Sequence, residues 1–393
     1  MCSLSLCMIV RNEETTIRTC LASARPHVDE IVVADTGSDD ATVAIAEECG
    51  ARVVSTIWRD DFAAARNRSL ALASGEWILV LDADERLTGD AGPKLRALLD
   101  APGGVVAYLL QQRTPTASSA TNGMVRVEWL PRLFRNGIGA RYVGAVHECV
   151  LPSLVGKGRA VHGDVVIEHD GYRRSPDVVR TKALRNVRIL LRGLERDPED
   201  ALAWLQVGDC HACLGDAPAA VDAYRAGLEL AERPVTPPRQ PISRAVAAVA
   251  WQQLGAALLV GGNPSEAVVA LNRALEVWPT LTSARVYLGQ AQARMGRWEL
   301  ALEHYRRAIR ESEGAVPSNQ PVHSAPWFAW HLKGAAEAKL GRSQAAERSL
   351  TEALRLHPEC ADARRLLQLV RQARAAVPAG GPGTAPGVAG GRG

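Results

Sequence analysis

The stretch from Trp77 to Glu85 constrains the fold of this chain more than any other part of the sequence. Five apolar residues, Trp77 to Leu81, are followed by three carboxylates within four positions. A short apolar run of this kind is typical of a buried strand in a parallel sheet that is covered on both faces. Ligands of such sheets bind at the carboxyl ends of the strands, where these acidic side chains are expected to lie.

Two of these carboxylates, Asp82 and Asp84, are two positions apart. On an extended strand their side chains would point to the same side of the sheet. Carboxylates that face one another repel unless a cation lies between them. Because Mg²⁺ and Mn²⁺ prefer oxygen ligands and carry substrate phosphates, the pair predicts a divalent metal site. Asp-x-Asp is also a common tripeptide that fits a solvated turn, so its place after a buried strand carries the prediction.

Strands and helices are expected to alternate through the first eighty or so positions of the chain. The alternation predicts an α/β domain with a doubly wound, mainly parallel sheet. Neither G-x-G-x-x-G nor G-x-x-x-x-G-K-[ST] follows the first strand, which argues against a dinucleotide-binding fold and a P-loop. The predicted strands are residues 4–10, 30–34, 52–55 and 77–81, and the predicted helices are residues 15–24, 42–49 and 62–73.

Polar residues follow three of these strands, at Asn12-Glu13, at Asp35 to Ser38 and at Asp82 to Glu85. Carboxylates at the first two positions suit a nucleoside, since they accept hydrogen bonds from ribose hydroxyls or a base N–H. The third position suits a metal ion and a diphosphate. We therefore predict a nucleotide site along the carboxyl edge of the sheet.

This region contains four ordered motifs: Leu6 to Glu14, Val28 to Ser38, Asp60 to Asn67 and Trp77 to Glu85. They resemble the motifs of bacterial family 2 glycosyltransferases, which have the GT-A fold, a Rossmann-like α/β domain. The resemblance is greatest to the branch with a C-terminal tetratricopeptide extension, which includes the sublancin-type peptide S-glycosyltransferases. The motifs are specific for the fold and for the use of a sugar nucleotide, and they carry little information about the acceptor.

The resemblance implies a role for each matched residue. Asp82 and Asp84 would bind Mg²⁺ or Mn²⁺, with Asp84 the surer ligand, and Arg66 would lie near the nucleotide. Many family members have Asp-Asp where this chain has Asp35-Thr36, a departure that leaves the base contact, and so the choice of uridine, open. The residues expected to contact the nucleotide-sugar are Asn12, Glu13, Asp35, Arg66 and Asp82.

Two later segments, Val127 to Asn136 and Tyr142 to Glu148, also resemble this branch. An inverting transfer needs a base near the acceptor nucleophile and a positive group beside the leaving diphosphate. We predict Glu148 as the base and His147 as a contact to the metal or diphosphate, although these two roles could be exchanged. Glu85 is the rival base, because it directly follows the metal pair. Packing is the expected role of three residues at the end of the domain, His162, His169 and Tyr172.

The second half of the chain contains four copies of a helical repeat. In each copy a glycine is followed at identical offsets by a second glycine, a small residue and an aromatic residue or leucine. This spacing is the tetratricopeptide pattern of paired helices, and stacked repeats present a concave surface that suits extended peptides or partner proteins. Two Pro-rich insertions, residues 233–241 and 313–326, lengthen the intervals between copies. The first glycines of the four copies are Gly208, Gly255, Gly289 and Gly334.

These patterns predict four segments: a GT-A domain over residues 1–174, a helical connector over 175–199, tetratricopeptide repeats over 200–372 and a disordered, Gly-, Pro- and Ala-rich tail over 373–393. The formal net charge of +3 indicates no dedicated nucleic-acid surface. No stretch approaches the roughly eighteen apolar residues of a membrane span. Scattered cysteines and the lack of a basic n-region lead us to expect a cytoplasmic protein.

The function implied by the resemblance is a metal-dependent inverting glycosyltransferase of the hexosyltransferase type. Its donor is expected to be a UDP-linked sugar, and its acceptor a peptide or protein presented by the repeats through protein–protein contacts. One alternative is a lipid-linked or cell-envelope glycan as acceptor. A second alternative is a tetratricopeptide scaffold whose N-terminal domain has lost catalysis. Glu13, Arg66, Asp82 and Asp84 argue against the scaffold, because a scaffold needs none of them.

Overall fold

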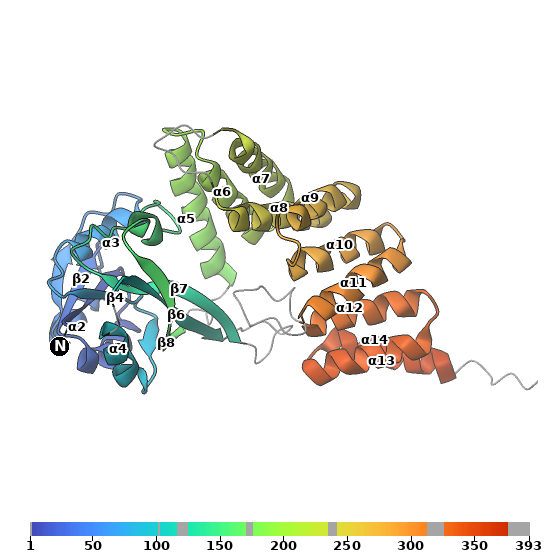
Figure 1. The fold of residues 1–393 in the computed structure, drawn as a ribbon, viewed down its shortest axis with the longest axis horizontal. Coiled ribbons are helices and arrows are strands. Elements are labelled where there is room, and N and C mark those ends of the chain that lie inside the picture. The colour runs from blue at the N-terminus through green and yellow to red at the C-terminus, as the bar shows by residue number, and fades with distance from the viewer. Residues whose placement is uncertain are drawn as a thin grey trace, which may run out of the picture.

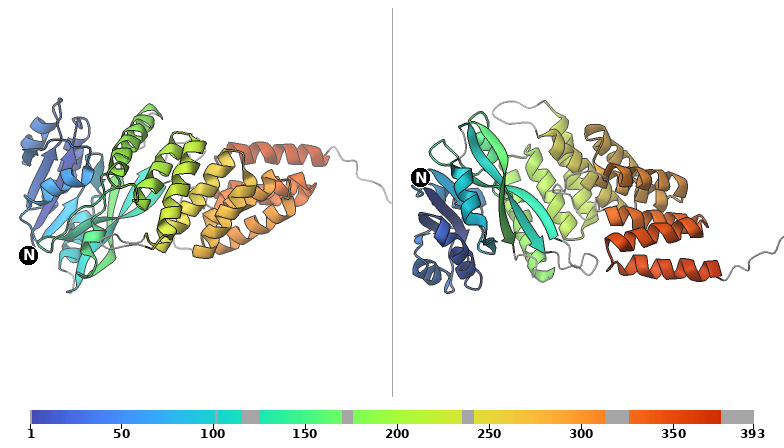
Figure 2. Two further views of the ribbon diagram at one scale, coloured as in Figure 1. Left: turned by 90° about the horizontal axis from the view of Figure 1, so that it is seen from above. Right: turned by 60° about the horizontal axis from the view of Figure 1, so that its bottom comes forward.

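The computed structural model describes residues 2–100, 103–115, 125–169, 176–234, 242–312 and 326–375. An α/β domain forms one end of an elongated molecule, and a curved row of helices leads away from it (Figure 1). The last helix of the row lies at the end farthest from the α/β domain in both further views (Figure 2). Among the described helices, none has the length and apolar character needed to cross a membrane.

In the described part of the α/β domain, eight strands form one sheet, in the order β3-β2-β1-β4-β7-β6-β8-β5. The half made of β3, β2, β1 and β4 is parallel, whereas β7 runs antiparallel to β4 and the sheet is mixed from there on. The predicted α/β fold class is therefore confirmed. The strands are β1 (Leu4–Val10), β2 (Glu30–Asp35), β3 (Arg52–Ser55), β4 (Trp77–Val80), β5 (Glu85–Leu87), β6 (Val105–Pro115), β7 (Val125–Arg135) and β8 (Arg159–His169).

Strand β4 is buried on both of its faces, as its apolar sequence predicts. Trp77 and Leu79 belong to the core cluster on one face of the sheet, while Ile78 and Val80 belong to the cluster on the other face. This burial fixes the strand so that its carboxyl end delivers the acidic residues to one edge of the sheet. The helices of the domain are α1 (Ile17–Ala24), α2 (Thr42–Glu48), α3 (Phe62–Leu70) and α4 (Ala91–Leu99), with short 3-10 helices η1 (Arg25–His27) and η2 (Leu151–Leu154).

Within the described residues, four helix pairs follow the α/β domain, and each contains one copy of the glycine pattern. The small residue of each copy is fully buried, which lets the two helices of a pair approach closely. A Cβ atom added at Gly208 would lie 2.6 Å from the ring of Tyr224, so the first glycine of that copy is required by the same close approach. The pairs are α6 (Ala201–Cys213) with α7 (Ala217–Glu232), α8 (Arg244–Val260) with α9 (Pro264–Val277), α10 (Thr282–Arg294) with α11 (Trp298–Ser312), and α12 (Pro326–Lys339) with α13 (Ser343–Leu356).

One helix lies on each side of the repeats: α5 (Pro176–Leu194) before them and α14 (Ala361–Ala375) after them. The boundary predicted at residue 174 lies outside the described residues, and residue 199 lies in the turn between α5 and α6. The boundary predicted at residue 372 falls within α14, and the rest of the predicted tail, residues 376–393, lies outside the described residues. Helix α5 packs between the α/β domain and α6, in one apolar cluster with residues from both.

Candidate active site

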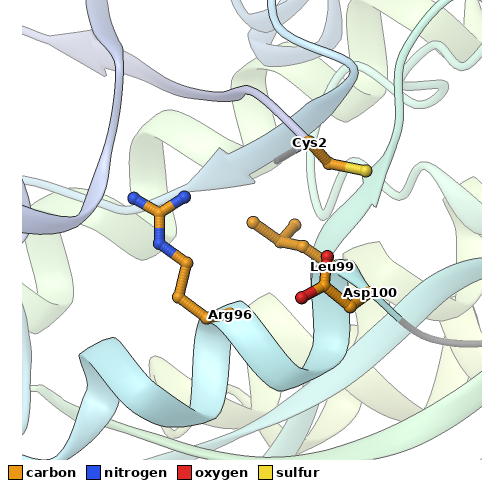
Figure 3. A pocket seen from close by; sticks show the side chains of 4 residues that line it. All are labelled: Cys2, Arg96, Leu99 and Asp100. Carbon is orange, nitrogen blue, oxygen red and sulfur yellow. The ribbon is translucent and has the colours of Figure 1, made fainter.

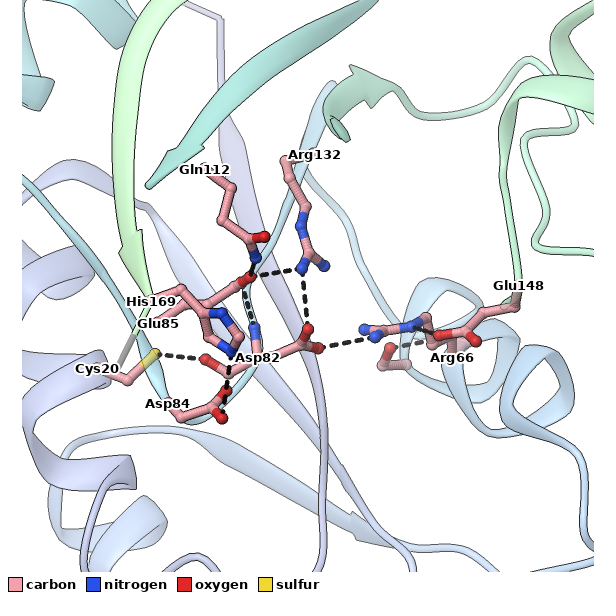
Figure 4. Close-up of polar contacts among 10 residues, drawn as sticks. Cys20, Arg66, Asp82, Asp84, Glu85, Gln112, Arg132, Glu148 and His169 are labelled. Atoms are coloured by element: carbon pink, nitrogen blue, oxygen red, sulfur yellow. Dashed lines mark hydrogen bonds and ion pairs between the residues drawn. The ribbon is translucent and has the colours of Figure 1, made fainter. Parts of the chain in front are cut away.

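The acidic residues after β4 lie in a tight turn between β4 and β5, not on an extended strand. The backbone N–H of Glu85 donates to the carbonyl oxygen of Asp82 at 3.0 Å, and the N–H of Asp82 donates to Glu85 Oε2 at 2.8 Å. Our argument that Asp82 and Asp84 share one side of a strand is therefore wrong. In Figure 4 the two carboxylates have separate partners, Asp82 among arginines and Asp84 beside His169.

Both carboxylate oxygens of Asp82 are held by guanidinium groups. Arg66 Nη2 donates to Oδ1 at 2.7 Å, and Arg132 Nη2 donates to Oδ2 at 2.8 Å. Burial alone would raise the pKa of Asp82, but the charges of Arg132 and Arg66 outweigh it and lower the pKa well below its usual range. Asp82 is thus ionised and binds two arginines. The contact with Arg132 was not predicted from the sequence.

The same two arginines reach the candidate bases. Arg66 Nε donates to Glu148 Oε1 at 2.5 Å, and Arg132 Nη2 donates to Glu85 Oε1 at 2.5 Å. The Glu85 side chain is 0% exposed and also accepts a hydrogen bond from Gln112. Burial raises the pKa of Glu85, which the charge of Arg132 offsets only in part. Glu85 is therefore enclosed by protein groups, whereas the side chain of Glu148 is 12% exposed.

Asp84 lies beside a histidine from the far end of the domain. His169 Nε2 is 3.3 Å from Asp84 Oδ2, and the two side chains are 22% and 10% exposed. His169 Nδ1 lies 3.1 Å from the hydroxyl of Thr114 on β6, which fixes the orientation of the ring. Burial would lower the pKa of His169, but the hydrogen bond and the charge of Asp84 raise it overall. His169, which the sequence analysis expected only to pack, therefore lies beside the predicted metal ligand Asp84.

Packing was also the expected role of His162 and Tyr172. His162 stacks on Trp129 with ring centroids 4.5 Å apart, which is a packing contact. Tyr172 lies outside the described residues. The sequence marks His169 only by its position at the end of a strand. Its place beside Asp84 results from the antiparallel pairing of β5 with β8, in which Glu85 is opposite His169.

The loops after β1 and β2, predicted to hold a nucleoside, are bound to each other. The N–H of Asn12 donates to Ser38 Oγ at 2.9 Å, and Asn12 Oδ1 accepts from the N–H of Asp39 at 3.0 Å. Asp35 is buried and accepts from the N–H of Gly37 and from both the N–H and hydroxyl of Ser38. The structure thus brings Asn12 and Asp35 together, and Asp35 holds its own loop in shape.

The two remaining predicted residues, Glu13 and His147, have different surroundings. Glu13 Oε2 accepts a hydrogen bond from the Thr16 hydroxyl at 2.9 Å. His147 has a left-handed backbone conformation, with φ of +52°. It lies near Asp209 of α6: burial raises the pKa of Asp209, and its hydrogen bond from Tyr224 and the charge of His147 lower it in part. The loop that contains His147 therefore faces the first repeat.

No group of three or more His, Cys, Asp or Glu side chains converges as metal ligands would within the part of the chain that the structure describes. Of the two metal ligands predicted from the sequence, Asp82 is bound by arginines and Asp84 lies beside His169. A small pocket elsewhere is lined by Cys2, Arg96, Leu99 and Asp100 (Figure 3). It lies at the amino end of β1, the opposite edge of the sheet, and contains none of the predicted site residues.

Comparison with known protein families agrees with this architecture. Residues 5–149 match the description Glycosyl transferase family 2, and residues 183–234, 253–316 and 331–367 match Tetratricopeptide repeat. The chain therefore carries a family 2 glycosyltransferase domain followed by tetratricopeptide repeats. The resemblance stated from the sequence motifs is confirmed.

Individual relatives share parts of the chain. A TPR repeat-containing protein of Synechococcus elongatus is 40% identical over 236 residues, which cover 58% of this chain and 57% of that protein. The SPbeta prophage-derived glycosyltransferase SunS of Bacillus subtilis is 27% identical over 209 residues, which cover 50% of this chain and 46% of SunS. The chain thus spans about half the length of the curated relatives it matches.

Among solved structures, a glucosyl-3-phosphoglycerate synthase from Mycobacterium tuberculosis is similar at 22% sequence identity and a TM-score of 0.36. The alignment covers 50% of this chain and 78% of that protein. The protein MamA is similar at 21% identity and a TM-score of 0.37, over 47% of this chain and 96% of MamA.

Proposed function

We propose that this chain transfers a sugar from a nucleotide diphosphate sugar to an acceptor, with inversion at the anomeric carbon and in a reaction that requires Mg²⁺ or Mn²⁺. A UDP-linked sugar is the proposed donor. The observation that carries the proposal is the pair formed by Asp84 and His169 at the carboxyl edge of the sheet, 3.3 Å apart and partly exposed. The family 2 domain over residues 5–149 supports the same reaction class.

The pair has the chemistry of a metal site that a substrate completes. A carboxylate and an imidazole are both good ligands for Mn²⁺, and such ions commonly take their other ligands from phosphate oxygens and water. Metal-ligating histidines usually have their second nitrogen fixed by a hydrogen bond, as Thr114 does for His169. Asp84 is favoured over Asp82 because both oxygens of Asp82 accept hydrogen bonds from arginines. When bound, the ion would neutralise the diphosphate leaving group.

Glu148 is the proposed base. The acceptor nucleophile attacks the anomeric carbon as the bond from that carbon to the diphosphate oxygen breaks, and Glu148 takes the proton of the nucleophile. The guanidinium group of Arg66 donates from Nε to Glu148 Oε1 and from Nη2 to Asp82 Oδ1. Arg66 therefore aligns the base with the acidic turn, so that the attacking and leaving groups meet in a fixed geometry.

A peptide or protein is the proposed acceptor. The contact between the α/β domain and the repeats supports this acceptor. The first repeat packs directly beside the loop that carries Glu148. Stacked repeats offer an extended surface on which a peptide segment can lie. An acceptor held there would reach the catalytic loop without leaving the protein.

The test is release of UDP from a panel of UDP-sugars, with Mn²⁺ or with a chelator, by the wild type and by Asp84→Asn. The proposal predicts slow release that needs the metal and is lost in Asp84→Asn. Asp90→Asn is the matched control, since Asp90 is an exposed aspartate of the same domain that pairs with Lys94. Activity that persists in Asp84→Asn would contradict the assignment of the metal. If the wild type released no nucleotide from any sugar, the scaffold alternative would gain support.

A further inference from the structure

One loop, residues 142–149, connects the candidate active site with the helical part of the protein. Val143 and Cys149 close it by exchanging two backbone hydrogen bonds, of 3.1 and 3.0 Å. Val146 at its tip is buried in one apolar cluster with Ile189 of α5 and Val207 of α6. Glu148 follows Val146 by only two residues, so the segment that docks on the helices also carries the proposed base.

Helix α3, which carries Arg66, is bound to the same loop. The N–H of Phe62 donates to the carbonyl oxygen of Ala145 at 3.0 Å. The side-chain amide of Asn67 donates to the Tyr142 carbonyl at 2.9 Å and accepts from the Tyr142 N–H at 2.8 Å. These three bonds lie on both sides of Arg66 along the helix. Arg66 and Glu148 are therefore held by one continuous unit made of α3 and the loop.

Helix α5 holds this unit from outside through Asp60, which precedes α3. Asp60 has a left-handed conformation, with φ of +57°. Its carboxylate pairs with Arg188 at 3.2 Å and with Arg192 at 2.5 Å, both from α5. The guanidinium of a third α5 residue, Arg185, lies 4.9 Å from the ring centroid of Phe62, the first residue of α3. Backbone strain of this kind persists where surrounding contacts hold it in place.

We infer that α5 and the first repeat are a structural part of the catalytic centre, in which Asp60, Val146 and Ile189 are positioning residues for Arg66 and Glu148. The helices would then be needed for chemistry on the donor even when no acceptor is bound to them. The catalytic meaning of this inference rests on the proposed function, whereas the mechanical link between α5 and the loop does not. Deleting the chain from residue 200 onward would also remove Val207, so it cannot separate positioning from capture of an acceptor.

The decisive comparison is Ile189→Ala with Ile309→Ala in the full chain. Ile189 is 2% exposed and lies in the cluster with Val146, whereas Ile309 is 6% exposed and lies between the third and fourth repeats. Both variants lose the same buried side chain and should lose similar stability. We expect only Ile189→Ala to slow Mn²⁺-dependent UDP release, by about tenfold or more, because small displacements of reacting groups are costly. We also expect only Ile189→Ala to speed amide hydrogen exchange in residues 142–149.

Asp60→Asn tests the polar part of the link. Asparagine tolerates the left-handed conformation and still accepts a hydrogen bond, so the variant removes mainly the charge that Arg188 and Arg192 bind. Because the pairs are partly exposed, we expect a smaller effect, a fall of about threefold in kcat with little change in KM for the donor. Arg180→Gln, on an exposed part of α5, is the control and should match the wild type.

The two readouts separate the inference from the proposed function. If the wild type releases UDP and Ile189→Ala behaves like Ile309→Ala in both release and exchange, the inference is overturned while the proposed function stands. If the wild type releases no UDP, the proposed function fails, and hydrogen exchange alone decides the link. Unchanged exchange at residues 142–149 in Ile189→Ala would then overturn the inference, and faster exchange confined to that variant would support it.

Discussion

His169 Nε2 lies 3.3 Å from Asp84 Oδ2, although the two residues belong to segments far apart in the sequence. The pairing of β5 with β8 brings them together, since Glu85 and His169 are opposite one another in the ladder. The acidic turn after β4 therefore gains an imidazole from the last strand of the domain. We regard this pair, and not two aspartates from one strand, as the centre of the donor site.

Thr114→Val tests how the His169 ring is fixed. The substitution removes the hydroxyl that lies 3.1 Å from His169 Nδ1 and keeps a β-branched side chain that suits strand β6. We expect the affinity for Mn²⁺ to fall by about tenfold or more, as when other partners of metal-ligating histidines are lost. Titration with Mn²⁺ in the presence of UDP measures this. Thr88→Val, just after β5, is the control, and equal affinity in the two variants would contradict the role given to Thr114.

Arg132→Met tests the buried charge network. Arg132 compensates the carboxylates of Asp82 and Glu85, and all three lie at the base of the acidic turn. Removing one partner from a buried ion pair typically costs about 3–5 kcal/mol. We therefore expect the free energy of unfolding, measured with urea, to fall by that amount. Adding Glu85→Gln should restore part of the loss, and a cost below about 1 kcal/mol in the single variant would show that the network is dispensable.

Glu30→Gln tests a carboxylate that joins the amino ends of the strands. Glu30 Oε1 accepts from the Ser5 hydroxyl, from the N–H and hydroxyl of Ser74 and from the N–H of Gly75. Burial raises the pKa of Glu30, but these hydrogen bonds outweigh it and lower the pKa overall from 4.5. A lowered folded-state pKa stabilises the fold above the unfolded value, and this stabilisation is lost as the pH falls through the lower folded value.

The expected result for Glu30→Gln is a loss of stability at pH 7 that shrinks as the pH falls below about 4. Urea unfolding of wild type and variant across that range measures the difference. A gap that stays constant with pH would mean that the charge of Glu30 contributes nothing to the stability of the α/β domain.

Gly208→Ala tests the close approach within the first repeat. The new methyl group would lie 2.6 Å from the Tyr224 ring, so the helices must separate. Overpacking of this kind typically costs about 1–3 kcal/mol. Gly193→Ala is the matched control, because Gly193 is also helical and its Cβ would meet nothing within 4 Å. We expect the control to be neutral or stabilising in thermal unfolding, and a similar loss in both variants would contradict the packing argument.

Local sequence patterns predicted the fold because they reflect local physics. The apolar run at Trp77 marks a strand buried on both faces, and constant offsets between glycines and small residues mark helix pairs that touch. The contacts of Asp82 and Asp84 could not be predicted from such local patterns. Strand β4 ends at Val80, and the turn that follows sends the two side chains to different partners. No local sequence pattern shows in which direction the side chains of such a turn will point.

The missed residues depend on contacts between distant segments. His169 has no motif around it, and its position beside Asp84 follows from the β5–β8 pairing. Arg132 lies on β7 beside the register shift between Tyr108 and Leu109 of β6, an irregularity that a sequence pattern does not reveal. The ion pairs between α5 and Asp60 likewise connect two distant segments, and the hydrophobic periodicity of each segment gives no information about such a contact.

The central claim is that Asp84 and His169 hold a metal ion for the diphosphate of the donor. Calorimetric titration of UDP into the wild type and into Asp84→Asn, with Mn²⁺ and then with a chelator, tests it most directly. We predict binding to the wild type that strengthens by about tenfold or more with Mn²⁺, and binding to Asp84→Asn that does not respond to the ion. Equal binding of UDP by both proteins, with and without Mn²⁺, would contradict the claim.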